Sequence, residues 1–308
     1  MKQNILQIGF FPHAMQQEID AQMTCWKEQE LNDNPALTHQ IQAIITRSNY
    51  TVTMDIIKRL PNLQIIATCG AGYDQIPVDF AREAGVVVTN TPDVLNTAVV
   101  ELGFGMMLSL LRQIPAADHY IREGNWPFGP YQLTNSLAGK KVGIVGMGRI
   151  GREFALRLDA FGVTISYFNR FEKNCPWNYV PSLHALAKDS NILIIALPGG
   201  SATCEIISRD ILQSLGPEGY LINIARGSVV DELALIEALQ SKQIAGAALD
   251  VYNDEPHINP RFFTFENVIL SPHAGSATKE TRQVMIKLAL DNLKTFFNTG
   301  KALTPVLK

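Results

Sequence analysis

The chain has 308 residues, of which 46% are hydrophobic and 18% are charged, and its formal net charge is −3. This length exceeds the usual size of a single hydrophobic core, so we expect a globular protein with two domains. The slightly acidic balance gives no reason to expect a nucleic acid or an anionic membrane as a partner. No apolar run approaches the roughly eighteen residues that predict a membrane-spanning helix.

Cysteine usage indicates the compartment. Four cysteines are scattered along the chain without a Cys-x-x-Cys pair, at Cys25, Cys69, Cys175 and Cys204. This pattern favours a reduced, cytoplasmic protein over a disulfide framework or a zinc site, and we expect no metal. The first residues predict a strand and not a signal peptide, because the apolar run is short and Pro12 follows it.

Residues 1–95 predict a small α/β unit. Short apolar runs at 5–10, 43–46, 63–68 and 86–89 alternate with amphipathic stretches at 19–30, 54–60 and 78–84. This alternation predicts a parallel sheet with helices on its faces, and ligands bind such sheets at the carboxyl ends of the strands. The segment Cys69-Gly70-Ala71-Gly72-Tyr73-Asp74 follows the third run, and its exposed backbone N–H groups are a candidate nest for a carboxylate. An ordinary strand-to-helix turn explains these glycines equally well.

The middle of the chain begins with a long apolar helix, predicted over 97–112 after the break at Pro92. A helix that is apolar almost all round is buried, here between domains or at a subunit interface. The loop at 124–136 carries Trp126, Phe128 and Tyr131, and burial against a second subunit would explain them. Further strands are predicted at 163–168, 192–197, 220–224, 246–248 and 268–270, with helices at 183–188, 209–215, 232–240 and 279–298. These elements suit a doubly wound sheet over 96–279, with 1–95 and 280–308 forming a discontinuous first domain.

Residues 141–168 carry a dinucleotide fingerprint. A β-branched run ends at Gly146, the sequence Gly146-Met147-Gly148-Arg149-Ile150-Gly151 follows, and a helical pattern and a second run come next. Gly146 permits a tight turn, Gly148 lets a pyrophosphate approach the backbone, and Gly151 lets helix and strand pack closely. The phosphates would lie at the helix N-terminus. The alternative is a structural glycine turn.

The end of the second run bears on the choice of dinucleotide. NAD-binding units carry an acid there for the ribose hydroxyl, whereas this chain has Asn169-Arg170. A guanidinium pairs well with a 2′-phosphate, so NADP(H) is favoured, with Arg149 and Lys173 adding positive charge. NAD(H) remains the alternative, with Glu172 on the ribose and Arg170 merely solvated.

Three later strand ends carry polar residues that core packing does not explain. Arg226 follows one apolar strand, Asp250 and Glu255 follow the next, and His273 follows the last, between a proline and small residues. These side chains suit hydride transfer to a carbonyl beside a carboxylate. Arg226 would hold the carboxylate, His273 would donate the proton, and Glu255 would hydrogen-bond His273 and keep it protonated. Taken singly, each residue is as well explained by a surface or capping role.

Together these segments resemble the D-isomer-specific 2-hydroxyacid dehydrogenases over essentially the whole chain, with Asn169-Arg170 and residues 91–95 most similar to the glyoxylate/hydroxypyruvate reductase branch. The resemblance implies a Rossmann-type cofactor domain inserted in a flavodoxin-like substrate domain, and a homodimer. It implies catalytic roles for Arg226, Glu255 and His273, and substrate binding by the amides of Ala71 and Gly72. The residues that it and the fingerprint place on the cofactor are Gly146, Gly148, Arg149, Ile150, Gly151, Asn169, Arg170, Leu197, Pro198, Ala225, Asp250 and Gly275.

The predicted function is therefore NADPH-dependent reduction of small 2-oxo acids such as glyoxylate and hydroxypyruvate. Two alternatives stay open. One is an NAD-linked dehydrogenase of the phosphoglycerate or D-lactate type, and the other is a non-catalytic dinucleotide sensor on the same fold. The small Ala71 in the substrate loop widens the choice of 2-oxo acid without changing the class of reaction.

Overall fold

A computed structural model describes residues 2–306, which divide into two compact units. Met1–Leu95 and Ser276–Lys308 form unit 1, and Asn96–Gly275 form unit 2. The sequence analysis puts the second change-over at 279/280, whereas the contacts put it at 275/276, so the turn before the last helix belongs with unit 1. Each unit contains one sheet whose strands all run parallel, which confirms the predicted α/β class.

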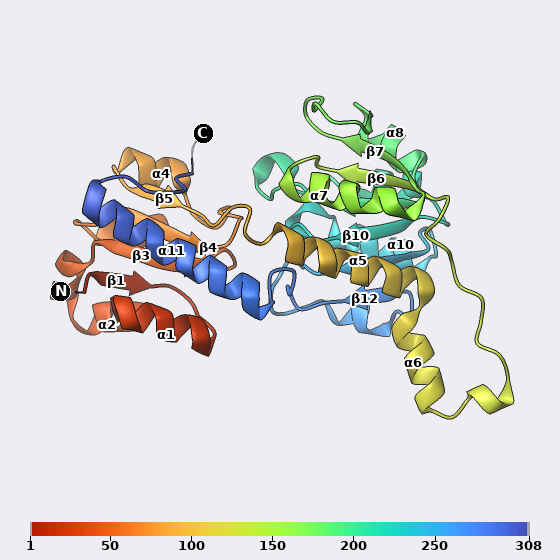
Figure 1. Cartoon of the computed structure of the whole chain (residues 1–308), viewed down its shortest axis with the longest axis horizontal. Helices are drawn as coiled ribbons and strands as arrows, with labels where there is room; N and C mark the ends of the chain where they lie inside the picture. Colours follow the sequence, from red (N-terminus) through yellow and green to blue (C-terminus); the bar gives the residue numbers. More distant parts are fainter. Residues whose placement is uncertain (1, 307–308) are drawn as a thin grey trace. The chain divides into compact units, whose positions relative to one another are not determined.

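Unit 1 is a five-stranded sheet in the order β2-β1-β3-β4-β5, which is the flavodoxin-like order (Figure 1). Its strands are β1 (Asn4–Gln7), β2 (Thr24–Trp26), β3 (Ala43–Arg47), β4 (Ile65–Cys69) and β5 (Val87–Thr89). Its helices are α1 (His13–Gln22), α2 (Glu28–Asp33), α3 (Met54–Arg59), α4 (Val78–Glu83) and α11 (Lys279–Thr299), with a 3₁₀ turn at Pro35–Gln40.

The central strands of unit 1 are buried on both faces. Every residue of β4 is buried, which explains why its sequence is a continuous apolar run instead of an alternating one. The helix α11 packs against β4, beginning at the capping residue Thr278 and ending at Gly300, which has a φ of 71°. The C-terminal helix therefore completes the fold of a unit that begins at the N-terminus.

Unit 2 is a seven-stranded sheet in the order β12-β11-β10-β9-β6-β7-β8, which is the Rossmann order extended by one strand. Its strands are β6 (Lys141–Val145), β7 (Thr164–Phe168), β8 (Asn178–Tyr179), β9 (Ile192–Ile195), β10 (Tyr220–Asn223), β11 (Gly246–Leu249) and β12 (Val268–Leu270). Its α-helices are α5 (Asn96–Arg112), α6 (Ile114–Arg122), α7 (Arg149–Leu158), α8 (Leu183–Lys188), α9 (Arg209–Leu215) and α10 (Glu232–Gln240).

The sequence analysis misassigns three places. It predicts one amphipathic stretch over 19–30, where α1 ends at Gln22 and the short edge strand β2 precedes α2. It also leaves α6 and β8 unassigned. The break before α6 is a left-handed residue, Gln113 with a φ of 50°, which intrinsic propensity does not predict.

Within residues 2–306, no single helix is both long and apolar enough to span a membrane. Only α5 and α6 taken together pass on length and composition, and they are bent by 60° at their junction.

Candidate active site

The glycine turn after β6 has the geometry that the fingerprint predicts. Gly146 has a φ of 104°, and a Cβ there would lie 2.8 Å from the backbone nitrogen of Leu197. A Cβ on Gly151 would lie 2.1 Å from the carbonyl oxygen of Gly146, so only glycine lets α7 approach β6 this closely. At Gly148 a Cβ would meet nothing within 4 Å, and α7 begins at the next residue. The open space lies at a helix N-terminus, where a pyrophosphate fits.

This turn lines a pocket of about 410 Å³. The residues that line it are Gly146, Met147, Gly148, Arg149, Arg152, Asn169, Lys173, Ala196, Leu197 and Pro198. Six of the predicted cofactor residues are among them, together with the cations Arg152 and Lys173. The donor set and the glycine cradle therefore fit a dinucleotide. The other six predicted cofactor residues do not line this pocket: Ile150, Gly151, Arg170, Ala225, Asp250 and Gly275.

The two residues directly after β7, Asn169 and Arg170, include a cation and no acid. Arg170 is exposed and makes no hydrogen bond or ion pair within residues 2–306, while the amide of Asn169 donates to the Phe171 carbonyl at 3.1 Å. Glu172, the acid that would serve a ribose hydroxyl, is exposed and is not among the pocket residues. A positively charged strand end is suited to a 2′-phosphate.

Glu255 and His273 form a hydrogen-bonded pair, as predicted. Nδ1 of His273 lies 2.6 Å from Oε2 of Glu255, and both side chains are partly buried. Burial raises the pKa of Glu255, but the hydrogen bond and charge of His273, the Tyr252 amide and the charge of Arg226 together hold that pKa below its usual value. Because the pair occupies Nδ1, Nε2 is the ring nitrogen left to serve a substrate.

Tyr252 connects the two loops that carry this pair, and the sequence analysis misses it. Its backbone N–H donates to Oε1 of Glu255 at 3.0 Å, and its hydroxyl shares its one proton between the carbonyls of Leu249 (2.9 Å) and Ser271 (3.0 Å). Burial raises the pKa of Tyr252 to about 12, so the hydroxyl stays protonated and remains a donor. The only signal in the sequence is that Tyr252 lies between Asp250 and Glu255 in the loop after β11.

Asp250 is buried and holds the histidine loop in place. Its carboxylate accepts from the Ser271 hydroxyl at 2.6 Å, the Ala274 amide at 2.7 Å and the Gly275 amide at 2.9 Å. His273, inside this loop, adopts a φ of 51°, which is uncommon for a residue with a side chain. The three bonds around it therefore support a backbone conformation that would otherwise be costly.

Arg226 follows β10 at the same sheet edge. Its Nη1 donates to the Ala225 carbonyl at 2.8 Å, and its charge acts on Glu255. A Cβ on Gly227 would lie 2.0 Å from the Tyr252 carbonyl carbon, so this loop packs directly on the loop that leads to Glu255. Unit 2 therefore brings Arg226, Glu255 and His273 together.

In unit 1, the predicted substrate loop follows β4. The Asn90 amide donates to the Ala71 carbonyl at 2.7 Å, and the Gly70 carbonyl accepts from the Thr91 amide at 2.9 Å. The N–H groups of Ala71 and Gly72 donate to no acceptor within residues 2–306. Two adjacent free amides on a braced loop are suited to binding a carboxylate.

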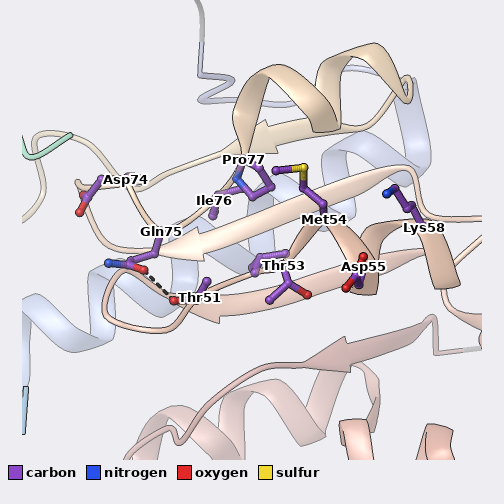
Figure 2. Close-up of a pocket in the computed structure, with 10 residues that line it drawn as sticks. Thr51, Thr53, Met54, Asp55, Lys58, Asp74, Gln75, Ile76 and Pro77 are labelled. Carbon is purple, nitrogen blue, oxygen red and sulfur yellow. Dashed lines mark hydrogen bonds between the residues drawn. The ribbon is translucent and has the colours of Figure 1, made fainter. Parts of the chain in front are cut away.

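Unit 1 has a pocket of its own, of about 540 Å³, beside α3 and the start of α4 (Figure 2). The Thr51 hydroxyl donates to the side-chain carbonyl of Gln75 at 2.7 Å across it. Apart from Asp74 at the end of the glycine loop, no residue of the predicted substrate or cofactor site lines this pocket.

Comparison with known proteins agrees with this geometry. Residues 104–275 match the family model for the NAD binding domain of D-isomer specific 2-hydroxyacid dehydrogenases. Hydroxyphenylpyruvate reductase from Plectranthus scutellarioides is 42% identical over 95% of both chains, and 2-ketogluconate reductase from Gluconobacter oxydans is 40% identical over 99% of both.

A solved structure is also similar. The NADPH-dependent glyoxylate/hydroxypyruvate reductase from Sinorhizobium meliloti, in complex with NADP and malonate, superimposes with a TM-score of 0.94 at 38% identity, covering 99% of this chain and 97% of the other. The chain belongs to the family of D-isomer specific 2-hydroxyacid dehydrogenases.

Proposed function

We propose that the protein is an NADPH-dependent reductase of small 2-oxo acids such as glyoxylate and hydroxypyruvate, with unit 2 as the cofactor domain and unit 1 as the substrate domain. The observation that carries the proposal is the 2.6 Å pair of Glu255 and His273, at the same sheet edge as Arg226 and in the unit that holds the glycine turn. The solved relative described as NADPH-dependent supports the choice of cofactor.

The turn at Gly146–Gly151 would hold the pyrophosphate, and Arg149, Arg170 and Lys173 would neutralise the 2′-phosphate. When bound, NADPH supplies the hydride that reduces the substrate carbonyl.

The side chains and backbone of the protein bind the substrate and supply the proton. Arg226 binds the substrate carboxylate with its planar fork and polarises the adjacent carbonyl. His273 donates the proton from Nε2 to the carbonyl oxygen as negative charge develops there, while Glu255 fixes the ring and stabilises its protonated form. Asp250 and Tyr252 keep both loops in position. The amides of Ala71 and Gly72 bind carboxylate oxygens.

The protein is also expected to be a homodimer. Apolar side chains on α6 and the segment after it are exposed, and this part of unit 2 projects from its sheet (Figure 1). Trp126 is 66% exposed, Phe128 90% and Leu133 98%. Burial of these residues against a second copy would remove them from water. Light scattering on the purified protein measures the mass directly.

Steady-state kinetics with glyoxylate, hydroxypyruvate, pyruvate and bulkier 2-oxo acids, each with NADPH and NADH, test the function. We expect turnover of the small acids with a preference for NADPH. Equal kcat/KM values with NADPH and NADH would contradict the NADPH preference that we infer from the residues after β7. Tight cofactor binding without turnover of any 2-oxo acid would indicate a dinucleotide sensor.

A further inference from the structure

The two residues after β5 fix the directions of the amides that are proposed to bind the substrate carboxylate. The Thr91 amide donates to the Gly70 carbonyl at 2.9 Å. The side-chain amide of Asn90 donates to the Ala71 carbonyl at 2.7 Å. A trans peptide unit is planar, and its N–H points away from its C=O. Because these two carbonyls share their peptide units with the N–H groups of Ala71 and Gly72, the bonds that hold the carbonyls also aim the N–H groups.

Asn90 is itself held by the segment that follows α11. This segment lies along β5, where Pro305 forms an antiparallel bridge with Thr89 (Figure 1). The hydroxyl of Thr304 donates to the Asn90 carbonyl at 2.5 Å, and the Thr304 carbonyl accepts from the Asn90 amide at 3.4 Å. Both backbone groups of Asn90 are therefore bonded to one residue that lies 214 positions later in the chain.

Asn292 of α11 fixes Thr304 in turn. Its Nδ2 donates to the Thr304 hydroxyl at 2.9 Å and to the Leu288 carbonyl at 3.0 Å, and its Oδ1 accepts from the Thr304 amide at 2.9 Å. Because the Thr304 hydroxyl accepts from Asn292, its single proton is left for the Asn90 carbonyl. Hydrogen bonds thus connect α11, through Thr304 and Asn90, to the carbonyl of Ala71.

The choice of an asparagine at position 292 supports a role beyond packing. Asn292 is fully buried, and the other buried residues of α11 are apolar. Burial of an amide costs free energy unless the amide is hydrogen-bonded, whereas an apolar side chain would pack here without that requirement. The amide of Asn292 holds both the hydroxyl and the backbone N–H of Thr304 in one orientation, which an apolar side chain could not do.

We propose that Asn292, Thr304 and Asn90 are positioning residues that aim the carboxylate-binding amides of Ala71 and Gly72. This inference rests on the proposed 2-oxo acid reductase function, in which those amides bind the substrate. Loss of one positioning residue leaves the loop in place with its N–H groups less well aimed. The protein should then bind the substrate carboxylate less tightly, while hydride and proton transfer in the bound complex continue as before.

Thr304→Val is the most specific test, because valine has nearly the same shape and lacks the hydroxyl. The KM for hydroxypyruvate should rise about threefold to tenfold, while kcat and the KM for NADPH stay within about twofold of the native values. Thr304→Ser keeps the hydroxyl and should restore the native KM. Asn90→Ala removes the last bond to the loop and should raise the KM by at least as much as Thr304→Val.

Thr299→Val is the matched control. The Thr299 hydroxyl donates to the Thr295 carbonyl at 2.7 Å and accepts from the Lys301 amide at 3.2 Å, so its partners lie on α11 and directly after it. This variant should leave the KM for hydroxypyruvate unchanged. If Thr304→Val does not fold, Asn90→Ala carries the test. Equal losses in kcat and in the KM values for both ligands would show a loosened fold and would overturn the positioning role.

Calorimetric titration with oxamate, an unreactive analogue of a small 2-oxo acid, measures the loop without turnover when NADP⁺ is present. Binding that Thr304→Val weakens at least about threefold, and that Thr304→Ser restores, supports the positioning role. Equal binding to the native protein and Thr304→Val, or binding to neither, overturns it. An unchanged KM in the variants, with hydroxypyruvate still reduced, overturns the positioning role alone, whereas a lack of turnover of every 2-oxo acid overturns the proposed function instead.

Discussion

The charged groups at the carboxyl ends of the strands differ between the two units. In unit 2 the acids and the imidazole satisfy one another, since Asp250 accepts three hydrogen bonds and Glu255 pairs with His273. In unit 1, the guanidinium groups of Arg47 and Arg282 pair with no carboxylate of residues 2–306. Because Glu255 already orients His273, the proton donor is in position before the substrate binds.

Removal of the proton donor should have the largest effect. His273→Ala should lower kcat by roughly 10²–10⁴-fold, the usual contribution of general acid catalysis. His257→Ala, an exposed histidine close in sequence, serves as the control and should leave kcat unchanged. Stopped-flow measurement of NADPH oxidation gives both values. An unaltered kcat in His273→Ala would show that another group donates the proton.

Arg226→Lys should have the next largest effect, a loss of kcat/KM. A point charge cannot reproduce the bidentate contact of a guanidinium, so we expect kcat/KM to fall roughly tenfold to a hundredfold. The comparison uses hydroxypyruvate at saturating NADPH. The same kcat/KM in both proteins would mean that Arg226 does not anchor the substrate carboxylate.

Cofactor preference should change by a smaller factor. Arg170→Asp replaces a cation at the β7 end with the acid that NAD-binding units carry, so the ratio of kcat/KM for NADPH over NADH should fall about tenfold. Glu172→Gln is the companion variant and should leave the use of NADH unchanged. A loss of NADH activity in Glu172→Gln would favour the alternative in which that acid binds the ribose.

The smallest expected effect is on stability. The pKa of Glu255 is lowered in the folded protein, so its carboxylate stabilises the fold above the unfolded pKa of about 4.3, and this contribution is lost as pH falls through the folded pKa. Glu255→Gln should therefore lower Tm by about 1–3 °C at pH 7, with a difference that shrinks below about pH 4. Glu266→Gln, at an exposed acid of the same unit, is the control and should leave Tm unchanged. A constant difference from pH 7 to pH 3 would contradict the assigned pair.

Much of the fold is predictable because long periodic segments dominate it. The helices at 183–188, 209–215 and 232–240 have the predicted bounds, and the continuous apolar strands indicate parallel sheets. The short edge strands β2 and β8 are not predictable, since two or three residues carry no periodicity of their own. The bend before α6 depends on one left-handed residue, Gln113.

The candidate site divides in the same way. Arg226, Glu255 and His273 stand out in the sequence because each follows an apolar strand. Tyr252 does not, since a tyrosine next to a strand is usually a core residue, and its role comes from a hydroxyl that reaches two carbonyls. The proximity of Arg47 to Arg282 cannot be predicted from the sequence because 234 residues lie between them, and only the packing of α11 on β4 brings them near each other.

A double-mutant cycle on Glu255 and His273 tests the central claim most directly. The kcat for hydroxypyruvate with NADPH is measured for the native protein, Glu255→Gln, His273→Ala and the double variant. Because Glu255 acts through His273, we expect Glu255→Gln to lower kcat on its own but to add almost nothing once His273 is removed. Losses that simply multiply in the double variant would show that the two residues act independently, and the account of a paired proton donor would be wrong.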